Sequence, residues 1–97
     1  MNLTEEQLSE IEEMAGLFIS PEDVATNIEM NEEETENFMH GIVMSNMNKI
    51  KNCAVDAYKR GWLKTEIELR KAIKQSALNG SSPSQQMMVN FQKEARI

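Results

Sequence analysis

Four helix-start signals divide this chain and limit the kind of fold that it can adopt. In each, a Ser, Thr or Asn is followed three residues later by Gln, Asp or Glu, a pattern that satisfies the free N–H groups at a helix start. The four pairs are Thr4–Gln7, Ser20–Asp23, Asn31–Glu34 and Ser82–Gln85. Pro21 and Pro83 stand at the first helical position of two of them. Because the sequence has no alternating apolar pattern typical of strands, it predicts an all-α fold.

Apolar spacing gives the extent of the helices in the first half of the chain. We expect a first helix at about residues 5–16, ended near Gly16, and a second from residue 21 to about 29. A third helix begins at residue 32, with Gly41 as its expected end. The stretch 42–48 fits either a loop or a helix.

The second half of the chain reads as two helices joined by a tight turn. From residue 49 to about residue 78 there is no Pro and a single Gly, which predicts a helix of about 45 Å. Asn79-Gly80 ends this helix, and Ser82 caps the next one. Residues 49–97 are therefore expected to form an antiparallel helical hairpin.

Within residues 1–41, the spacing of apolar residues is typical of a helix-turn-helix-like module of three helices. Such a module needs the inner faces of two short crossed helices to share a core with the helix before them. The residues expected to point inward or to shape the turn are Val24, Ala25, Ile28, Met30, Thr35 and Phe38. Glu29 stands at the turn position that Gly usually takes.

Charge is divided sharply between the two halves. Residues 1–48 hold twelve acidic and no Lys or Arg side chains, whereas residues 49–97 hold ten basic and four acidic ones. The expected exposed positions of the third helix are Glu32, Glu33, Glu36 and Asn37, whose carboxylates repel phosphates. Two interpretations stay open: this helix reads a major groove, with Asn37 in contact with DNA, or the module is structural or binds protein.

The long helix is expected to be amphipathic. Its apolar stripe comprises Ile50, Ala54, Tyr58, Gly61, Trp62, Thr65, Leu69, Ala72 and Ile73. The opposite side carries Lys49, Arg60, Lys64, Lys71 and Lys74. This basic side is either a solvated charged face or a ridge that contacts phosphates or another acidic surface. The apolar stripe exceeds what one short helix covers, which predicts self-association.

Other classes of function find little support in the residue inventory. The single His40 and single Cys53 offer no metal-ligand or disulfide set. No glycine-rich phosphate loop or nucleophile–histidine–acid set occurs, so we expect no enzyme, catalytic residue, metal or cofactor. The acidic start does not fit a signal peptide, and no apolar run has membrane-spanning length. A cytoplasmic protein is therefore expected.

Two segments, LTEEQLSEIEEMAGLFISPEDVA and AYKRGWLKTEIELRKAIKQSALNGSSPSQQMM, carry a resemblance to a known family. Over residues 3–92 the chain resembles the small terminase subunits of tailed bacteriophages and prophages. The resemblance implies a helix-turn-helix that engages packaging-site DNA, a large terminase ATPase as partner, and a bacterial host cell. It also implies a hairpin that assembles a homo-oligomer, which would use Tyr58, Gly61, Trp62, Leu69, Ile73, Met88 and Phe91.

The sequence thus leads to two hypotheses about function. The first is a non-enzymatic DNA-packaging recognition subunit that binds duplex DNA as an oligomer and recruits a packaging ATPase. In this hypothesis the DNA contacts come from Lys49, Arg60, Lys64, Lys71, Lys74 and Asn37. The alternative is a protein–protein interaction module or prophage regulator whose helix-turn-helix does not read DNA.

Overall fold

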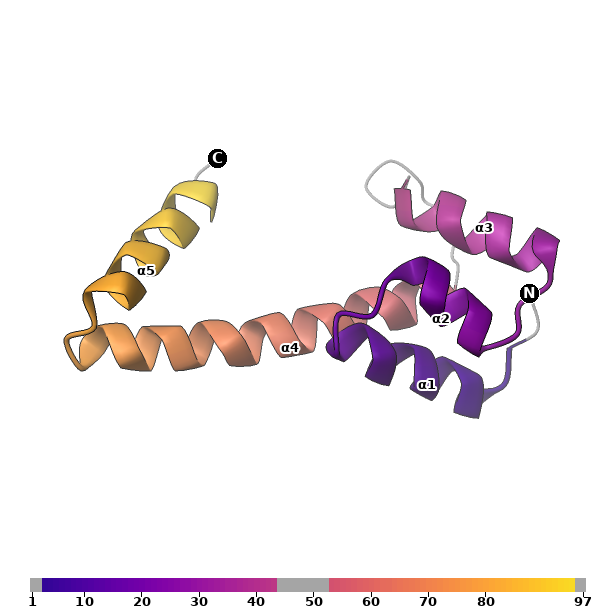
Figure 1. The fold of residues 1–97 in the computed structure, drawn as a ribbon, viewed down its shortest axis with the longest axis horizontal. Coiled ribbons are helices and arrows are strands. Elements are labelled where there is room, and N and C mark those ends of the chain that lie inside the picture. The colour runs from indigo at the N-terminus through magenta and orange to yellow at the C-terminus, as the bar shows by residue number, and fades with distance from the viewer. Residues whose placement is uncertain (1–2, 44–52, 96–97) are drawn as a thin grey trace. The chain divides into compact units, whose positions relative to one another are not determined.

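The computed structural model describes residues 3–43 and 53–95, and the elements within these two ranges are all α-helices (Figure 1). They are α1 (Glu5–Gly16), α2 (Pro21–Asn27), α3 (Glu32–Val43), α4 (Cys53–Leu78) and α5 (Ser82–Ala95). The predicted all-α class is confirmed. None of these helices, in the parts of the chain described, combines the length and apolarity needed to cross a membrane.

The helix bounds agree with the sequence except at the ends of α2 and α3, and α2 ends at Asn27 instead of at about residue 29. The prediction that Gly41 ends the third helix is wrong, because α3 continues to Val43. Gly41 keeps a negative φ there, and a helical glycine costs only about 1 kcal/mol relative to Ala. The expected first residues of the long helix, 49–52, lie outside the described residues.

Three of the predicted caps form as expected. In α1 the Thr4 hydroxyl accepts from the Gln7 N–H at 3.1 Å, and the Gln7 side chain accepts from the Thr4 N–H at 2.9 Å. Asn31 and Glu34 make the same reciprocal pair at the start of α3, with distances of 2.8 and 3.1 Å. The Ser20 hydroxyl caps α2. Each start is therefore satisfied by its own side chains.

The fourth predicted cap is displaced by one residue. Ser81, not Ser82, accepts from a helix N–H, that of Ser84 at 3.4 Å, so Ser82 is the first helical residue of α5. The cause is the tight turn: Gly80 has a φ of 98°, and the Ser81 N–H bonds back to the Ser76 carbonyl. Ser81 thereby closes α4 and caps α5.

Helices α1, α2 and α4 end in the same hydrogen-bonded turn, in which a residue with positive φ follows the last helical turn. In α2 the Glu29 N–H bonds to the Thr26 carbonyl and the Met30 N–H to the Ala25 carbonyl. The residue with positive φ is Phe18 after α1, Glu29 after α2 and Gly80 after α4. Glu29 therefore adopts the left-handed conformation for which this turn position usually uses Gly, at a cost of about 1–2 kcal/mol.

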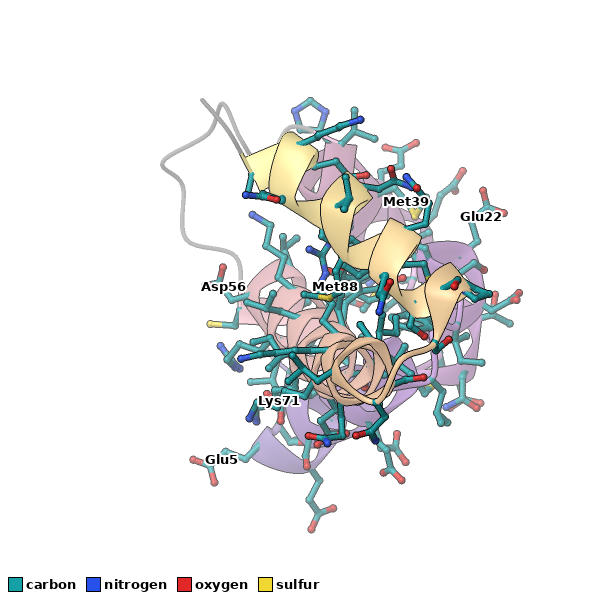
Figure 2. The ribbon with its side chains drawn as sticks, turned by 90° about the vertical axis from the view of Figure 1, so that its left-hand side faces the viewer. Glu5, Glu22, Met39, Asp56, Lys71 and Met88 are labelled. Atoms are coloured by element: carbon teal, nitrogen blue, oxygen red, sulfur yellow. The ribbon has the colours of Figure 1, made fainter. Side chains whose placement is uncertain are left out.

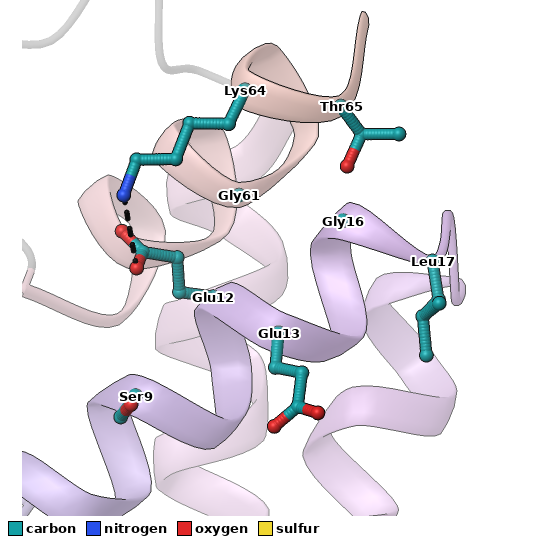
Figure 3. Close-up of a pocket in the computed structure, with 8 residues that line it drawn as sticks. All are labelled: Ser9, Glu12, Glu13, Gly16, Leu17, Gly61, Lys64 and Thr65. Atoms are coloured by element: carbon teal, nitrogen blue, oxygen red, sulfur yellow. Dashed lines mark hydrogen bonds and ion pairs between the residues drawn. The ribbon is translucent and has the colours of Figure 1, made fainter. Parts of the chain in front are cut away.

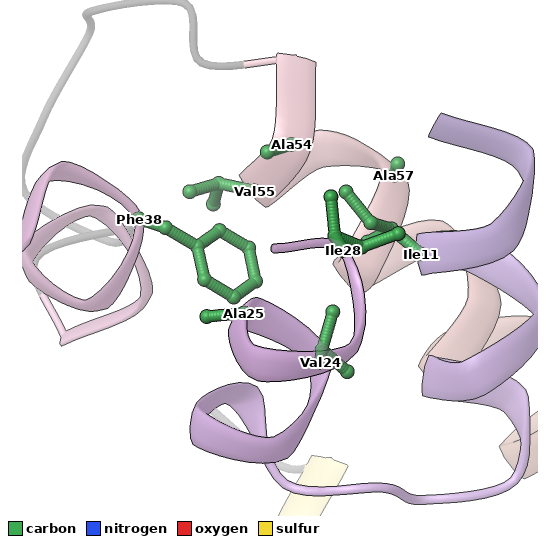
Figure 4. Close-up of a cluster of buried hydrophobic side chains, with 8 residues drawn as sticks. All are labelled: Ile11, Val24, Ala25, Ile28, Phe38, Ala54, Val55 and Ala57. Carbon is green, nitrogen blue, oxygen red and sulfur yellow. The ribbon is translucent and has the colours of Figure 1, made fainter. Parts of the chain in front are cut away.

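The chain divides into two compact units, residues 1–65 and residues 66–97, with the boundary inside α4. The first unit adds the start of α4 to the three helices before it. Its core draws on all four of these helices (Figure 4). The core residues are Ile11, Val24, Ala25, Ile28, Phe38, Ala54, Val55 and Ala57.

Phe38 is the largest of the fully buried side chains and lies against the Tyr58 ring, with centroids 6.0 Å apart in an edge-to-face arrangement. The inward positions predicted for Val24, Ala25, Ile28 and Phe38 are confirmed by their burial.

The second unit holds its two helical segments together through few contacts. No residue of α5 is buried. The Arg70 guanidinium lies 3.9 Å from the centroid of the Phe91 ring and 2.9 Å from the Glu66 carboxylate, with Glu94 at 3.9 Å. The Gln85 side chain donates to the Ala77 carbonyl at 3.1 Å. Large apolar side chains of this unit therefore stay open to solvent.

Candidate nucleic-acid interface

The outward side of α3 is acidic. The turn at Glu29 and the burial of Phe38 orient α3 so that Glu32, Glu33, Glu36 and Asn37 are exposed. The acids at the starts of α1 and α2 also face solvent, and Figure 2 shows Glu5 and Glu22 extending outward. Because residues 3–43 contain no Lys or Arg, this surface offers phosphate no permanently charged donor.

Two of the predicted DNA-binding cations converge on one carboxylate of α1. The Arg60 Nε lies 3.1 Å from Glu12 Oε1, and the Lys64 Nζ lies 3.3 Å from Glu12 Oε2 (Figure 3 shows the Lys64 contact). These hydrogen bonds, first that of Arg60 and then that of Lys64, lower the pKa of the Glu12 carboxyl. The carboxylate is therefore ionised at neutral pH and each of its oxygens is engaged.

A close approach of α1 and α4 positions this group. A Cβ added to Gly61 would overlap the carbonyl oxygen of Glu12, so only glycine fits there. A Cβ added to Gly16 would lie 2.9 Å from the Thr65 hydroxyl oxygen. Arg60 and Lys64 flank Gly61 in sequence, one residue before and three after it, and lie one helical turn apart. Both side chains therefore reach the same side of α1.

Aromatic residues make a second set of contacts within this unit. The Phe18 and Trp62 rings meet edge to face with centroids 5.2 Å apart, and their residues are 44% and 40% exposed. The Tyr58 hydroxyl donates to the Ile19 carbonyl at 2.8 Å, and burial raises the pKa of Tyr58. Of the residues predicted to assemble subunits, Tyr58 and Gly61 are thus engaged inside the unit, whereas Trp62 stays partly open.

The remaining predicted residues lie in the second unit, apart from Asn37, already described, and Lys49, which falls outside the described residues. Lys71 (labelled in Figure 2) and Lys74 are exposed, and neither has an ion-pair partner among the residues that the structure describes. Leu69 is 49% exposed, and Ile73, Met88 and Phe91 are half-buried.

The sequence did not single out Glu12 or Arg70. Ile11 belongs to the apolar stripe of α1, and Glu12 follows it in sequence. A charged residue next to a buried stripe can lie at the edge of a helix–helix contact, and this was the one signal in the sequence that pointed to Glu12. Arg70 pairs with Glu66 at i, i+4 spacing, at 2.9 Å. Its contact with Phe91 joins two different helices, and no local sequence pattern predicts that contact.

A shallow pocket of about 320 Å³ lies beside the Glu12 group (Figure 3). Its lining comprises Ser9, Glu12, Glu13, Gly16, Leu17, Gly61, Lys64 and Thr65. Within residues 3–43 and 53–95, no three His, Cys, Asp or Glu side chains gather closely enough to hold a metal ion. The chemistry of the region is that of ion pairs.

Comparisons with protein-family models, with curated proteins and with solved structures gave no match.

Proposed function

We propose that the protein is a non-enzymatic DNA-binding subunit that acts as an oligomer and contacts duplex DNA through cations of α4. The observation that carries this proposal is the exposure of Lys71 and Lys74, which have no ion-pair partner in the described part of the chain. The resemblance to small terminase subunits adds a role in DNA packaging and a large ATPase partner. The helix-turn-helix-like module and the helical hairpin are parts of the same proposal.

The proposed contacts are to phosphates and not to bases. Each phosphate that a Lys or Arg neutralises releases counterions, which supplies affinity independent of sequence. The exposed positions of α3 that are best shaped for a groove are mainly Glu32, Glu33 and Glu36, which disfavour its approach to the backbone. Discrimination among sequences is therefore expected to be weak.

Assembly is supported by apolar side chains that the second unit leaves open. Leu69, Leu78, Met87 and Val89 are 49%, 72%, 47% and 42% exposed, and α5 buries no residue. Exposed apolar surface of this kind marks contact sites between proteins. A second copy of the chain that covers these residues would also multiply the number of phosphates contacted.

The test compares two double variants in DNA-binding titrations, with light scattering to verify assembly. Lys71→Glu/Lys74→Glu should lower affinity for duplex DNA by at least about tenfold, since two phosphate contacts become repulsive. Glu33→Ala/Glu36→Ala is the counterpart on α3 and should leave affinity unchanged or slightly higher. If the α3 variant abolishes binding and the α4 variant does not, the acidic helix is the reader and the proposed contacts are wrong.

A second candidate function is a protein–protein interaction module, favoured by the acidic exposed side of α3. A surface with Glu32, Glu33 and Glu36 and no Lys or Arg in residues 3–43 suits a basic protein partner. The same titrations distinguish the two functions. If no duplex binds at low salt while the chain stays folded, the interaction module takes the place of the DNA-binding subunit.

A further inference from the structure

Glu12 stands where a phosphate would stand between Arg60 and Lys64. We propose that Glu12 is an internal competitor that masks a phosphate-binding site made by these two side chains and so limits the affinity of the protein for DNA. The inference rests on the proposed DNA-binding function and gives it a regulatory element. It predicts that Arg60 and Lys64 contact phosphates only when their ion pairs with the Glu12 carboxylate are broken.

The geometry of the group is that of an anion site. Two cationic donors from one helix approach two oxygens of the same acid at 3.1 and 3.3 Å. A phosphate presents oxygens that accept from the same Arg and Lys donors in the same way. The backbone contact between Gly61 and Glu12 holds the two helices together, so Arg60 and Lys64 start from the same side of α1 whether or not the acid is charged.

Exposure makes the exchange feasible. The Arg60 and Lys64 side chains are 57% and 67% exposed, whereas that of Glu12 is 28% exposed. An external anion therefore reaches the cations without unfolding α1. Exposed ion pairs are weak and are screened by salt, so the closely spaced phosphates of a duplex compete well with one carboxylate.

The carboxylate also cancels charge where DNA would approach. Arg60, Lys64 and Glu12 together carry one net positive charge, and the lowered pKa of Glu12 keeps the carboxylate ionised at neutral pH. Removal of its charge by Glu12→Gln doubles the local positive charge and replaces two charged acceptor oxygens by one neutral amide oxygen, which weakens the hold on both cations. A change of net charge alone produces only the first of these effects. A control variant with the same charge change elsewhere therefore separates the effect of net charge from the release of the two cations.

The chain supplies that control in the next residue. Glu13 is exposed and has no ion-pair partner among the described residues, so Glu13→Gln changes the net charge as Glu12→Gln does but frees no cation. Fluorescence anisotropy with a labelled duplex of about 20 base pairs at about 50 and about 200 mM salt is the measurement. The fluorescence of Trp62, the single Trp, confirms that each variant is folded.

We expect Glu12→Gln to bind about threefold to tenfold more tightly than the parent chain at the lower salt concentration. Its salt dependence should steepen by about 0.9 for each of the two added phosphate contacts. Glu13→Gln should stay within about twofold of the parent. The triple variant Glu12→Gln/Arg60→Gln/Lys64→Gln should lose the gain, because the unmasked cations produce it.

Three results would overturn the inference. Equal gains in Glu12→Gln and Glu13→Gln would reduce the effect to net charge and leave the proposed DNA binding intact. A gain that persists in the triple variant would place the new contacts elsewhere. The absence of binding by the parent and all variants would remove the inference and the proposed function together.

Discussion

Gly61 of α4 lies so close to Glu12 of α1 that a methyl group in place of its hydrogen would overlap the Glu12 carbonyl oxygen. The atom in the way belongs to the backbone, so it cannot move aside by a change of rotamer. This contact fixes the side of α4 that faces α1. It thereby decides that Arg60 and Lys64 reach Glu12 and that Tyr58 reaches Ile19.

Replacement of Gly61 by Ala should therefore destabilise the first unit by about 1–3 kcal/mol, although Ala favours a helix. Gly16→Ala is the matched variant: its added Cβ meets the Thr65 hydroxyl, a side-chain atom that can rotate away. Its cost should be clearly smaller. Urea unfolding followed by Trp62 fluorescence measures both. Equal effects would show that the Gly61 contact relaxes easily.

The left-handed Glu29 predicts a stabilising substitution. Glu29→Gly should raise the free energy of unfolding by about 0.5–1 kcal/mol. Glycine adopts this φ without a clash, which stabilises the folded chain. Its greater freedom in the unfolded chain offsets part of that gain. Glu36→Gly, in the exposed interior of α3, should instead cost about 1 kcal/mol. Thermal unfolding by circular dichroism compares them, and a loss of stability in Glu29→Gly would contradict the assigned turn.

Tyr58 is the only tyrosine, so its ionisation can be followed by ultraviolet absorbance without interference from others. Burial raises the pKa of its hydroxyl in the folded chain above that of the unfolded chain. The neutral form therefore stabilises the fold below pH about 10, and this contribution is lost as pH rises through the folded pKa. We expect the absorbance transition to move down to an ordinary value when the chain is unfolded in urea.

The hydrogen bond of Tyr58 to Ile19 is tested by Tyr58→Phe. The variant should lose about 1 kcal/mol of stability at neutral pH, because the Ile19 carbonyl loses its donor while the ring contact with Phe38 is kept. Its stability should also fall less steeply above pH about 10 than that of the parent chain. An unchanged stability would mean that water replaces the hydroxyl at no cost.

Arg70 is expected to control how firmly α5 is held within the second unit. Arg70→Gln removes the contact with Phe91 and both carboxylate contacts, and should lower protection of the α5 amides by about 1 kcal/mol. Lys71→Gln, at the next position, should leave α5 unchanged. Hydrogen exchange measured by NMR resolves the helix directly. Similar exchange in the two variants would remove Arg70 from this role.

Local rules accounted for the helices, since capping pairs such as Asn31–Glu34 act within one turn and can be recognised in the sequence. They misplaced the last cap by one residue. Ser81 both closes α4 and caps α5, and it can do so only because Gly80 adopts a positive φ in the turn between them. They also allowed Gly41 to end α3, although glycine alone does not end a helix.

The candidate site was less accessible to sequence reasoning. The cations of α4 follow from periodicity, but their engagement by Glu12 joins residues 48 and 52 positions apart. The resemblance to small terminase subunits implied that Tyr58 and Gly61 assemble subunits, and both lie on the apolar stripe that also holds Trp62 and Leu69. The residues of that stripe have different surroundings. Ala54, Tyr58 and Gly61 pack within the first unit, whereas Leu69 is exposed to solvent.

The most direct test of the central claim is the salt dependence of duplex DNA binding by the full chain. If cations of α4 contact phosphates, the logarithm of the affinity should fall linearly with the logarithm of salt concentration, with a slope of about −1.8 or steeper for two or more contacts. In Lys71→Glu/Lys74→Glu this slope should become shallower as affinity falls. An affinity for duplex DNA that does not change with salt concentration would contradict the account, and so would the absence of binding to any duplex at about 50 mM salt.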